Sequence, residues 1–171
     1  RVLARNPDRL RDVPWARDVE IVRGDLLDAD TLDAAFADVD IAYYLVHSMA
    51  GGHGAGSFED SERSSAHNVA TVAKRAGVER IVYLGGLHPD GAELSRHLRS
   101  RAEVGDVLLA SGVPTAVLQA GVVIGSGSAS FEMVRHLTEV LPYMPAPRWV
   151  RNRIQPIAVR DVLHYLIGAA E

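Results

Sequence analysis

The segment AHNVATVAKRAGVERIVYLGGL, residues 66–87, decides the fold of this chain. Its first half reads as the end of a long helix that closes at Gly77, where glycine can adopt the left-handed conformation of a C-cap. A strand over 78–86 follows at once, and its centre, IVYL, is a continuous apolar run. Such runs are typical of parallel strands that helices cover on both faces. The segment therefore predicts a helix that leads directly into a buried parallel strand.

The same alternation of apolar strands and helices extends to both sides of this segment. Further strands are expected over 1–5, 19–25, 39–48 and 113–125, and helices from about Pro7 and over 29–38, 57–77, 92–112 and 159–171. Strands separated by helices form right-handed βαβ units in a parallel sheet. The sequence thus predicts an α/β fold with a doubly wound parallel sheet.

The composition fits a single domain over residues 1–171. Hydrophobic residues make up 47% of the chain and charged residues 23%, and the net charge is −4. A nucleic-acid-binding domain normally carries a basic excess, so no nucleic acid is expected as a partner. The chain has no cysteine, which excludes disulfides and thiolate metal sites. No apolar run approaches the roughly 20 residues of a membrane span and no signal peptide is visible, so a cytoplasmic protein is expected.

A dinucleotide-binding fold needs a glycine-rich turn after its first strand, where backbone N–H groups and a helix N-terminus hold the pyrophosphate. GGHGAG (51–56) lacks the G-x-G-x-x-G spacing, and GSGSAS (125–130) follows the last long strand, so both are interpreted as loops that frame a cleft. The chain begins without Met on a strand and ends on an uncapped helix. We therefore expect the first strand and its glycine-rich turn upstream of Arg1, in a longer protein.

The first visible strand ends at Arg5, and ligands of a doubly wound sheet bind at the carboxyl ends of its strands. An acid at this position holds the ribose hydroxyls of NAD, whereas an arginine accommodates the 2′-phosphate of NADP. With Arg9 one turn further along, the sequence favours NADP as the cofactor, with NAD as the alternative. The other interpretation of Arg5 is a solvated arginine at a strand end.

The next strand ends in GDLLD, residues 24–28. Asp25 is a candidate to accept a hydrogen bond from an adenine amino group, and Leu26 is a candidate to pack on the adenine ring. Gly-Asp at the end of a strand is also ordinary turn chemistry, so the pattern is weak when taken alone.

Basic residues gather in SRHLRSR, residues 95–101, on the second long helix. Like charges three or four positions apart destabilise a helix, so the cluster requires a local explanation. His97 and Arg101 are four positions apart and therefore share one helix face. Arg96 and Arg99 are interpreted as plain surface charge.

The seven histidines raise the question of a metal site. None of them has H-x-x-x-H or H-E-x-x-H spacing, so no metal is expected. His47, His53, His88 and His97 all fall on the loop side of the expected sheet, which indicates a polar cleft. A serine hydrolase is excluded because the chain has no G-x-S-x-G motif.

The order of these motifs resembles a known family. The motifs that carry the resemblance are GDLLD (24–28), VDIAYYLVHSM (39–49), the 66–87 segment, VPTAVLQAGVVIGSGSASFEMVRHL (113–137) and PIAVRDVLHYL (156–166). Together they are similar to the atypical short-chain dehydrogenase/reductases, and most similar to the NmrA-like, sugar-epimerase-like bacterial NAD(P)H-binding proteins. The resemblance covers essentially the whole chain and implies a Rossmann-like NAD(P)-binding domain. In that subgroup a glycine-rich strand and helix come first, and a further domain often follows.

The resemblance also implies where catalysis takes place. The family places a serine or threonine after the strand IVYL and a Tyr-x-x-x-Lys pair on the next helix. Gly85 and Gly86 occupy the serine position here, and His97 and Arg101 have the Tyr/Lys spacing. Arginine can bind the nicotinamide ribose but does not titrate usefully. Histidine can transfer protons near neutral pH.

Further site residues follow from the same resemblance. Asn68 matches the asparagine with which the family supports its active site through hydrogen bonds. Gln119 and Gly121 stand where relatives have Arg-Pro-Gly, whose backbone faces the nicotinamide carboxamide. Val46 and His47, at the end of the strand over 39–48, are expected to contact the cofactor.

Two functions remain open at this point. The first is an NADP-dependent oxidoreductase or epimerase-like enzyme acting on a small polar substrate. The second is a non-catalytic NADP(H)-binding sensor that acts through a protein partner. The lost Ser, Tyr and Lys favour the sensor, whereas the histidine-rich cleft favours the enzyme. The two long helices are the expected contact of a homodimer.

Overall fold

The computed structural model describes residues 1–47, 58–88, 94–125, 129–141 and 155–171. The strands are β1 (Val2–Ala4), β2 (Ile21–Arg23), β3 (Ile41–Tyr44), β4 (Arg80–Gly86), β5 (Thr115–Ala120), β6 (Val123–Ile124) and β7 (Ile157–Ala158). The helices are α1 (Asp33–Phe36), α2 (Phe58–Ala76), α3 (Arg96–Leu109), α4 (Ala129–Val140) and α5 (Val159–Gly168). Short 3₁₀ turns lie at η1 (Pro7–Leu10), η2 (Ala16–Asp18) and η3 (Ala29–Thr31).

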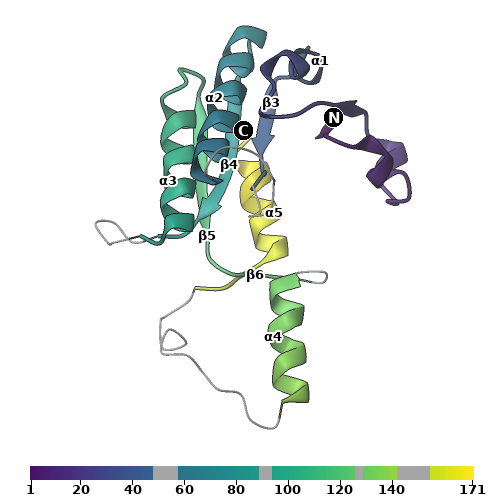
Figure 1. Cartoon of the computed structure of the whole chain (residues 1–171), viewed down its shortest axis with the longest axis vertical. Coiled ribbons are helices and arrows are strands. Elements are labelled where there is room, and N and C mark those ends of the chain that lie inside the picture. Colours follow the sequence, from purple (N-terminus) through teal and green to yellow (C-terminus); the bar gives the residue numbers. More distant parts are fainter. Residues whose placement is uncertain (48–57, 89–93, 126–128, 142–154) are drawn as a thin grey trace.

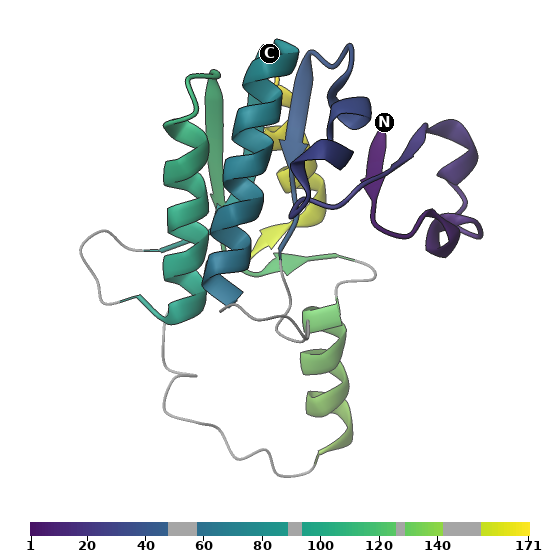
Figure 2. The same ribbon diagram turned by 45° about the horizontal axis from the view of Figure 1, so that its top comes forward.

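A three-stranded parallel sheet, in the order β3-β4-β5, forms the centre of the molecule. Helices α2 and α3 cover one face of this sheet and α5 covers the other, as Figure 1 and Figure 2 show. This arrangement confirms the predicted α/β fold with parallel strands between two helical layers. The strand register pairs Tyr44 with Tyr83 and Gly86 with Ala120, so the three carboxyl ends meet at one edge. Helix α4 lies beyond that edge.

The β4 strand distributes its side chains to both layers because successive residues of a strand point to opposite faces. Ile81 and Tyr83 belong to the core under α2 and α3. Val82 packs instead with Val162 and Leu166 of α5. All three β4 residues are almost completely buried, as expected for a central parallel strand.

Strands β1 and β2 form a separate parallel pair. The guanidinium of Arg1 joins this pair to its surroundings, since it donates to Glu20 at 2.7 Å and to the carbonyl of Ala37 at 2.5 Å. Within the described ranges, no strand pairs with both β1 and β3. The first five strands are therefore divided into the pair β1-β2 and the sheet β3-β4-β5.

Several elements differ from the sequence prediction in their bounds. The helix expected over 92–112 begins at Arg96, because Ser95 caps it by accepting from the Leu98 amide at 3.4 Å. The strand expected over 113–125 breaks into β5 and β6 around Gly121, and β6 pairs with β7, which the sequence analysis missed. The C-cap expected at Gly77 is confirmed by its φ of 76°.

Candidate functional site

A cavity of about 350 Å³ lies at the carboxyl ends of β3, β4 and β5. Its lining comes from the ends of these strands, the residues that follow them, and one face of α3. The lining residues are His47, Leu84, Gly85, Gly86, Leu87, Leu98, Arg101, Ala120, Gly121, Val122 and Val123. The cavity therefore occupies the place where a doubly wound sheet binds its ligand. Most of its wall is apolar, with one imidazole and one guanidinium as its titratable groups.

The two glycines at the end of β4 allow α3 to approach closely. A Cβ atom on Gly86 would lie 3.0 Å from Leu98 Cδ2 and 3.3 Å from Arg101 Cδ. A Cβ atom on Gly85 would lie 3.0 Å from the ring of Tyr83. Contacts this short require the neighbouring side chains to move. At the position where the family carries a serine, the side chains of α3 therefore pack tightly against the strand end and supply the wall.

Arg101 is anchored to the sheet through its backbone. Its carbonyl accepts a hydrogen bond from the hydroxyl of Tyr83 at 3.0 Å, and its side chain lines the cavity. Burial raises the pKa of Tyr83 to about 12, against the opposing effect of the Arg101 cation and with a further increase from Glu62. Tyr83 therefore keeps its proton at neutral pH and acts as a structural donor.

His97 lies outside the residues that line the cavity. It is exposed, and its ring stacks on Phe58 of α2 with centroids 4.9 Å apart and an interplanar angle of 29°. The side chains that α3 turns toward the cavity are Leu98 and Arg101, which are three positions apart. His97 and Arg101 share a broad helix face, but only Arg101 reaches the cavity.

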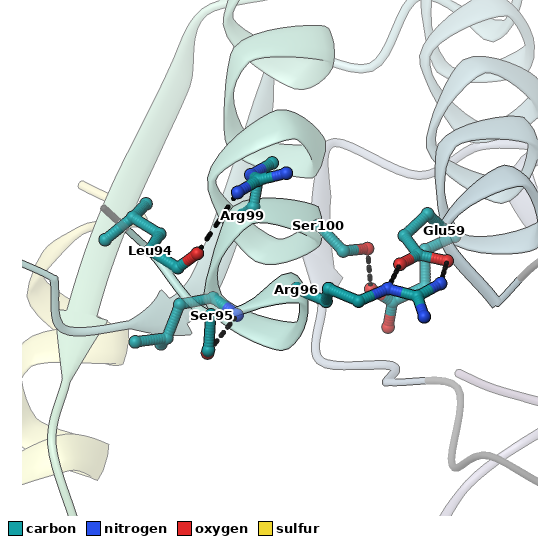
Figure 3. Close-up of polar contacts among 8 residues, drawn as sticks. Glu59, Leu94, Ser95, Arg96, Arg99 and Ser100 are labelled. Atoms are coloured by element: carbon teal, nitrogen blue, oxygen red, sulfur yellow. Dashed lines mark hydrogen bonds and ion pairs between the residues drawn. The ribbon is translucent and has the colours of Figure 1, made fainter. Parts of the chain in front are cut away.

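Arg96 and Arg99 behave as surface charges (Figure 3). Arg96 is exposed and forms a two-pronged ion pair with Glu59, at 2.7 Å and 3.1 Å. Arg99 donates to the carbonyl of Leu94 at 3.3 Å. Neither side chain lines the cavity, as the sequence interpretation held.

A buried acid, Glu62 of α2, lies behind this part of α3. The hydroxyl of Ser100 donates a hydrogen bond to the Glu62 carboxylate. Glu62 is only 4% exposed and Ser100 only 1%. The pKa of Tyr44 is raised mainly by burial, next by the Glu62 carboxylate, and least by Tyr83. The sequence analysis missed Glu62. The available signal was its place on the inner face of α2, three and four positions before the buried Ser65 and Ala66.

His47 is the imidazole inside the cavity. It follows β3, lies half-buried, and lines the cavity with Arg101. Burial lowers the pKa of His47 most, and the Arg101 cation lowers it further. The Glu62 carboxylate raises the pKa of His47, and His97 lowers it. His47 is therefore mainly neutral at neutral pH.

Asn68 holds a different part of the site. Its Nδ2 donates to the carbonyl of Leu26 at 2.8 Å, which ties α2 to the loop after β2. Asn68 is not among the residues that line the cavity. The structure thus places the predicted supporting asparagine at the GDLLD loop.

The GDLLD loop is shaped mainly by turn contacts. The carboxylate of Asp25 accepts from the Leu27 amide at 3.0 Å, and the Asp25 amide donates to the Thr31 hydroxyl at 2.9 Å. Leu26 packs against the hydrophobic core, whereas Leu27 is 52% exposed. A Cβ atom on Gly24 would lie 2.7 Å from Leu3 and 2.8 Å from the Thr31 carbonyl, so this position requires glycine.

A second cavity, of about 340 Å³, follows the carboxyl end of β1. Two guanidiniums and one indole stand out in its lining, which consists of Val2, Leu3, Ala4, Arg5, Asn6, Arg9, Leu10 and Trp15. The structure thus brings Arg5 and Arg9 together at one cavity. Trp15 was not predicted, and its only sequence signal was a tryptophan shortly after a basic turn. Two cations beside an aromatic ring suit a phosphorylated ligand with a flat base.

The remaining predicted cofactor residues occupy varied positions. Gln119 is exposed, and its Nε2 lies 3.2 Å from Nε2 of His88. Gly121 lines the first cavity, where its backbone passes close to the carbonyl of Gln155. Val46 is 51% exposed next to His47.

The part of the chain that the structure describes offers neither a metal site nor a membrane-spanning helix. No group of three or more His, Asp or Glu side chains is placed there to hold a metal ion. No described helix has the length and apolar character needed to cross a bilayer.

Comparisons with known proteins place the chain in a family. Residues 1–120 match the family described as NAD(P)H-binding. A comparison with curated protein sequences found no match.

Solved structures resemble the chain in fold. Citrobacter sp. triphenylmethane reductase, complexed with NADP(H), is 21% identical with a TM-score of 0.60, over 80% of this chain and 44% of that one. The Bordetella bronchiseptica enzyme WbmH, in complex with NAD+, is 17% identical with a TM-score of 0.72, and the match covers 98% of this chain and 62% of that one. Escherichia coli NADPH-dependent quinone oxidoreductase QOR2, complexed with NADPH, is 25% identical with a TM-score of 0.58, and the match covers 71% of this chain and 39% of that one.

The chain thus spans about half the length of these structures. The Rossmann-like fold, the resemblance to reductase- and epimerase-type NAD(P)-binding proteins and the nicotinamide cofactor predicted from the sequence are all confirmed. The family match covers well over half of the 171 residues. The chain belongs to the NAD(P)H-binding family.

Proposed function

We propose that the protein is an NADP-dependent oxidoreductase that reduces a small carbonyl compound in the cavity at the carboxyl ends of β3, β4 and β5. One observation carries the proposal: this cavity combines apolar walls with a cation, Arg101, and a titratable imidazole, His47. The reductases among the similar structures support the same reaction class. The lining favours a substrate with an apolar body and one polar oxygen over the small polar substrate expected from the sequence.

Residues around both cavities fit the cofactor. Arg5 and Arg9 are placed to receive the 2′-phosphate of NADP, and Trp15 offers an aromatic face beside them. Gly85, Gly86 and Gly121 contribute backbone to the wall of the first cavity, which would receive the nicotinamide ring, and Arg101 is available there to a ribose. When bound, the reduced cofactor supplies a hydride.

The pyrophosphate, which lies between the 2′-phosphate and the nicotinamide ends of the cofactor, would need a separate binding element. The divided sheet supports a further parallel strand between β1 and β3, which are unbridged within the described ranges. Beside this edge the apolar side chains Tyr43 and Leu45 are 44% and 48% exposed, which a further strand and helix would cover. The upstream coding sequence tests this proposal, because it should contain a strand followed by a glycine-rich turn.

Hydride transfer is the direct test of the proposed function. The full-length protein is incubated with NADPH deuterated at C4 and a panel of aldehydes and ketones. An oxidoreductase transfers deuterium from only one face of the nicotinamide into a product. If cofactor binds but no deuterium reaches any product, the enzyme proposal loses its support. NADH carried through the same panel measures the preference for NADP.

The sensor remains as a second candidate, and one observation favours it. Gly85 and Gly86 leave no hydroxyl at the position of the family's serine, and Leu98 and Arg101 of α3 pack tightly against Gly86. A sensor of this kind binds NADPH and NADP+ with different affinities and passes the difference to a protein partner. Calorimetric titration with both cofactor forms, together with the absence of deuterium transfer, distinguishes this candidate from the enzyme.

The expected homodimer through the two long helices is also a proposal. The ion pair between Arg63 of α2 and Glu103 of α3, at 3.0 Å, already joins these helices on their exposed side. A second copy would have to dock over such polar contacts. Light scattering of the full-length protein measures the oligomeric state, and R63E tests whether this face takes part.

A further inference from the structure

The cavity contains two titratable side chains among its described lining residues, His47 and Arg101. A guanidinium does not release its proton at working pH, so it can hold an oxygen but cannot protonate it. Tyr83 stands close by, but its hydroxyl is committed to the carbonyl of Arg101. Among the described residues that line the cavity, the imidazole is therefore the side chain that can supply a proton to the substrate oxygen.

We propose that His47, and not His97, transfers the proton to the substrate oxygen, while Arg101 holds the nicotinamide ribose beside it. The inference rests on the proposed function and assigns the proton-transfer residue of the same cavity. His97 is excluded by its position, since it is exposed against Phe58 and does not line the cavity.

The position of His47 is fixed by the strand that precedes it. β3 ends at Tyr44, whose buried ring meets the ring of Tyr83 edge to face at 5.7 Å. This aromatic contact locks the end of β3 to β4, the strand that carries Gly85 and Gly86. His47 follows Tyr44 by three residues, and its imidazole lines the cavity together with Arg101 of α3.

Three charged or titratable groups act on His47 from the packed helices. Arg101 and His97 of α3 disfavour its protonated form, and Glu62 of α2 favours it. Glu62 is itself held by Ser100. Burial contributes most to the lowered pKa of His47, and the Glu62 carboxylate opposes only part of the decrease, so the imidazolium gives up its proton readily.

The substrate carbon gains a hydride as its π bond to oxygen breaks, and the oxygen takes the proton of the His47 imidazolium. The N–H bond breaks, an O–H bond forms, and the neutral imidazole is reprotonated from solvent. In sum, NADPH, one proton and a carbonyl give NADP+ and an alcohol. In the opposite direction the neutral His47 accepts the alcohol proton.

Variants of the full-length protein test this role. H47Q removes the titratable group but keeps a polar side chain, H97Q removes the competing histidine, and H67Q replaces an exposed histidine on α2 as the matched control. For H47Q we expect NADPH affinity within about threefold of the parent and a 10²- to 10⁴-fold lower turnover with 4-nitrobenzaldehyde as probe. H67Q and H97Q should retain turnover.

Two readouts add to the rate. In the parent, reduction should slow as pH rises through the pKa of His47, because only the protonated imidazole donates, and H47Q should lose this dependence. Independently of turnover, NMR titration of the His47 ring should give a pKa below the ordinary 6.5 that moves upward in R101Q.

The possible failures are distinguishable. If the parent binds NADPH but transfers hydride to no probe, the proposed function and the role of His47 are both overturned. If the parent turns over and H47Q keeps both its rate and its pH profile, only the role of His47 is overturned. Loss of turnover in H97Q alone, or a His47 pKa at or above 6.5, also contradicts the assignment.

Discussion

The hydroxyl of Ser100 on α3 donates a hydrogen bond to the carboxylate of Glu62 on α2, and both side chains are almost fully buried. The bond joins the two long helices directly behind the cavity wall. Ser100 directly precedes Arg101 in the sequence, and the charge of Glu62 raises the pKa of Tyr44 and of His47. The helix pair and the electrostatics of the cavity thus depend on one buried contact.

Loss of this contact should destabilise the fold. S100A removes a donor from a buried carboxylate, so we expect a decrease of about 1–3 kcal/mol in the free energy of unfolding. Urea denaturation of the parent and the variant measures the difference. S64A, at an exposed serine of α2, is the control and should stay within about 0.5 kcal/mol of the parent. Equal midpoints for S100A and S64A would show that the buried bond contributes nothing.

Asn68 should couple stability to cofactor binding. N68A removes the tie to the Leu26 carbonyl, which is expected to lower the free energy of unfolding by roughly 1 kcal/mol. If the GDLLD loop contacts the cofactor, NADPH affinity should fall as well, because the loop must then be ordered on binding. Denaturation and calorimetry on the same samples separate the two effects. T71A, on an exposed part of α2, is the control. An unchanged affinity in N68A would remove the loop from the cofactor site.

Arg5 should set the preference for NADP. A guanidinium paired with a 2′-phosphate contributes roughly 1.5–3 kcal/mol, or about one to two decades in affinity. We expect R5A to lose this amount for NADP and little for NAD. R17A changes an exposed arginine of η2 and should leave both affinities unchanged. Equal affinities of the parent for NADP and NAD would contradict the assignment.

His47 should make stability depend on pH. Its folded-state pKa lies below the ordinary value of 6.5, so the unfolded chain binds the proton more tightly. Stability contributed in this way is complete above pH 6.5 and decreases as pH falls below that value. Urea midpoints measured between pH 5 and 7.5 should therefore fall less steeply toward acid in H47Q than in the parent. Identical slopes would indicate an imidazole that titrates as it does in the unfolded chain.

The sequence predicted the parts of the fold that leave long periodic patterns. The continuous apolar runs of β4 and β5 and the glycine after α2 were sufficient for the parallel sheet. Two-residue strands leave no such pattern, so β6 and β7 and their pairing were beyond prediction. The division of the sheet between β1 and β3 was visible only in the strand pairing.

The site was predicted in part, for reasons that His97 and Arg101 illustrate. Residues four apart on a helix differ by roughly 40° around its axis, and this is enough to separate a cavity residue from its neighbour. The packing of α2 against α3 decides the outcome, because Phe58 holds the His97 ring outside. Glu62 and Ser100 escaped prediction because their pairing joins two helices that are distant in sequence.

The affinity of the R101A variant for NADPH tests the central claim most directly, namely that the cavity beside Arg101 receives the cofactor. Calorimetric titration compares the full-length parent, R101A and the control R99A, whose arginine lies on the same helix outside the cavity. We expect R101A to bind NADPH at least about tenfold more weakly, since a charge-assisted contact contributes roughly 1.5 kcal/mol or more. R99A should bind like the parent. Equal NADPH affinities in all three proteins would contradict the account.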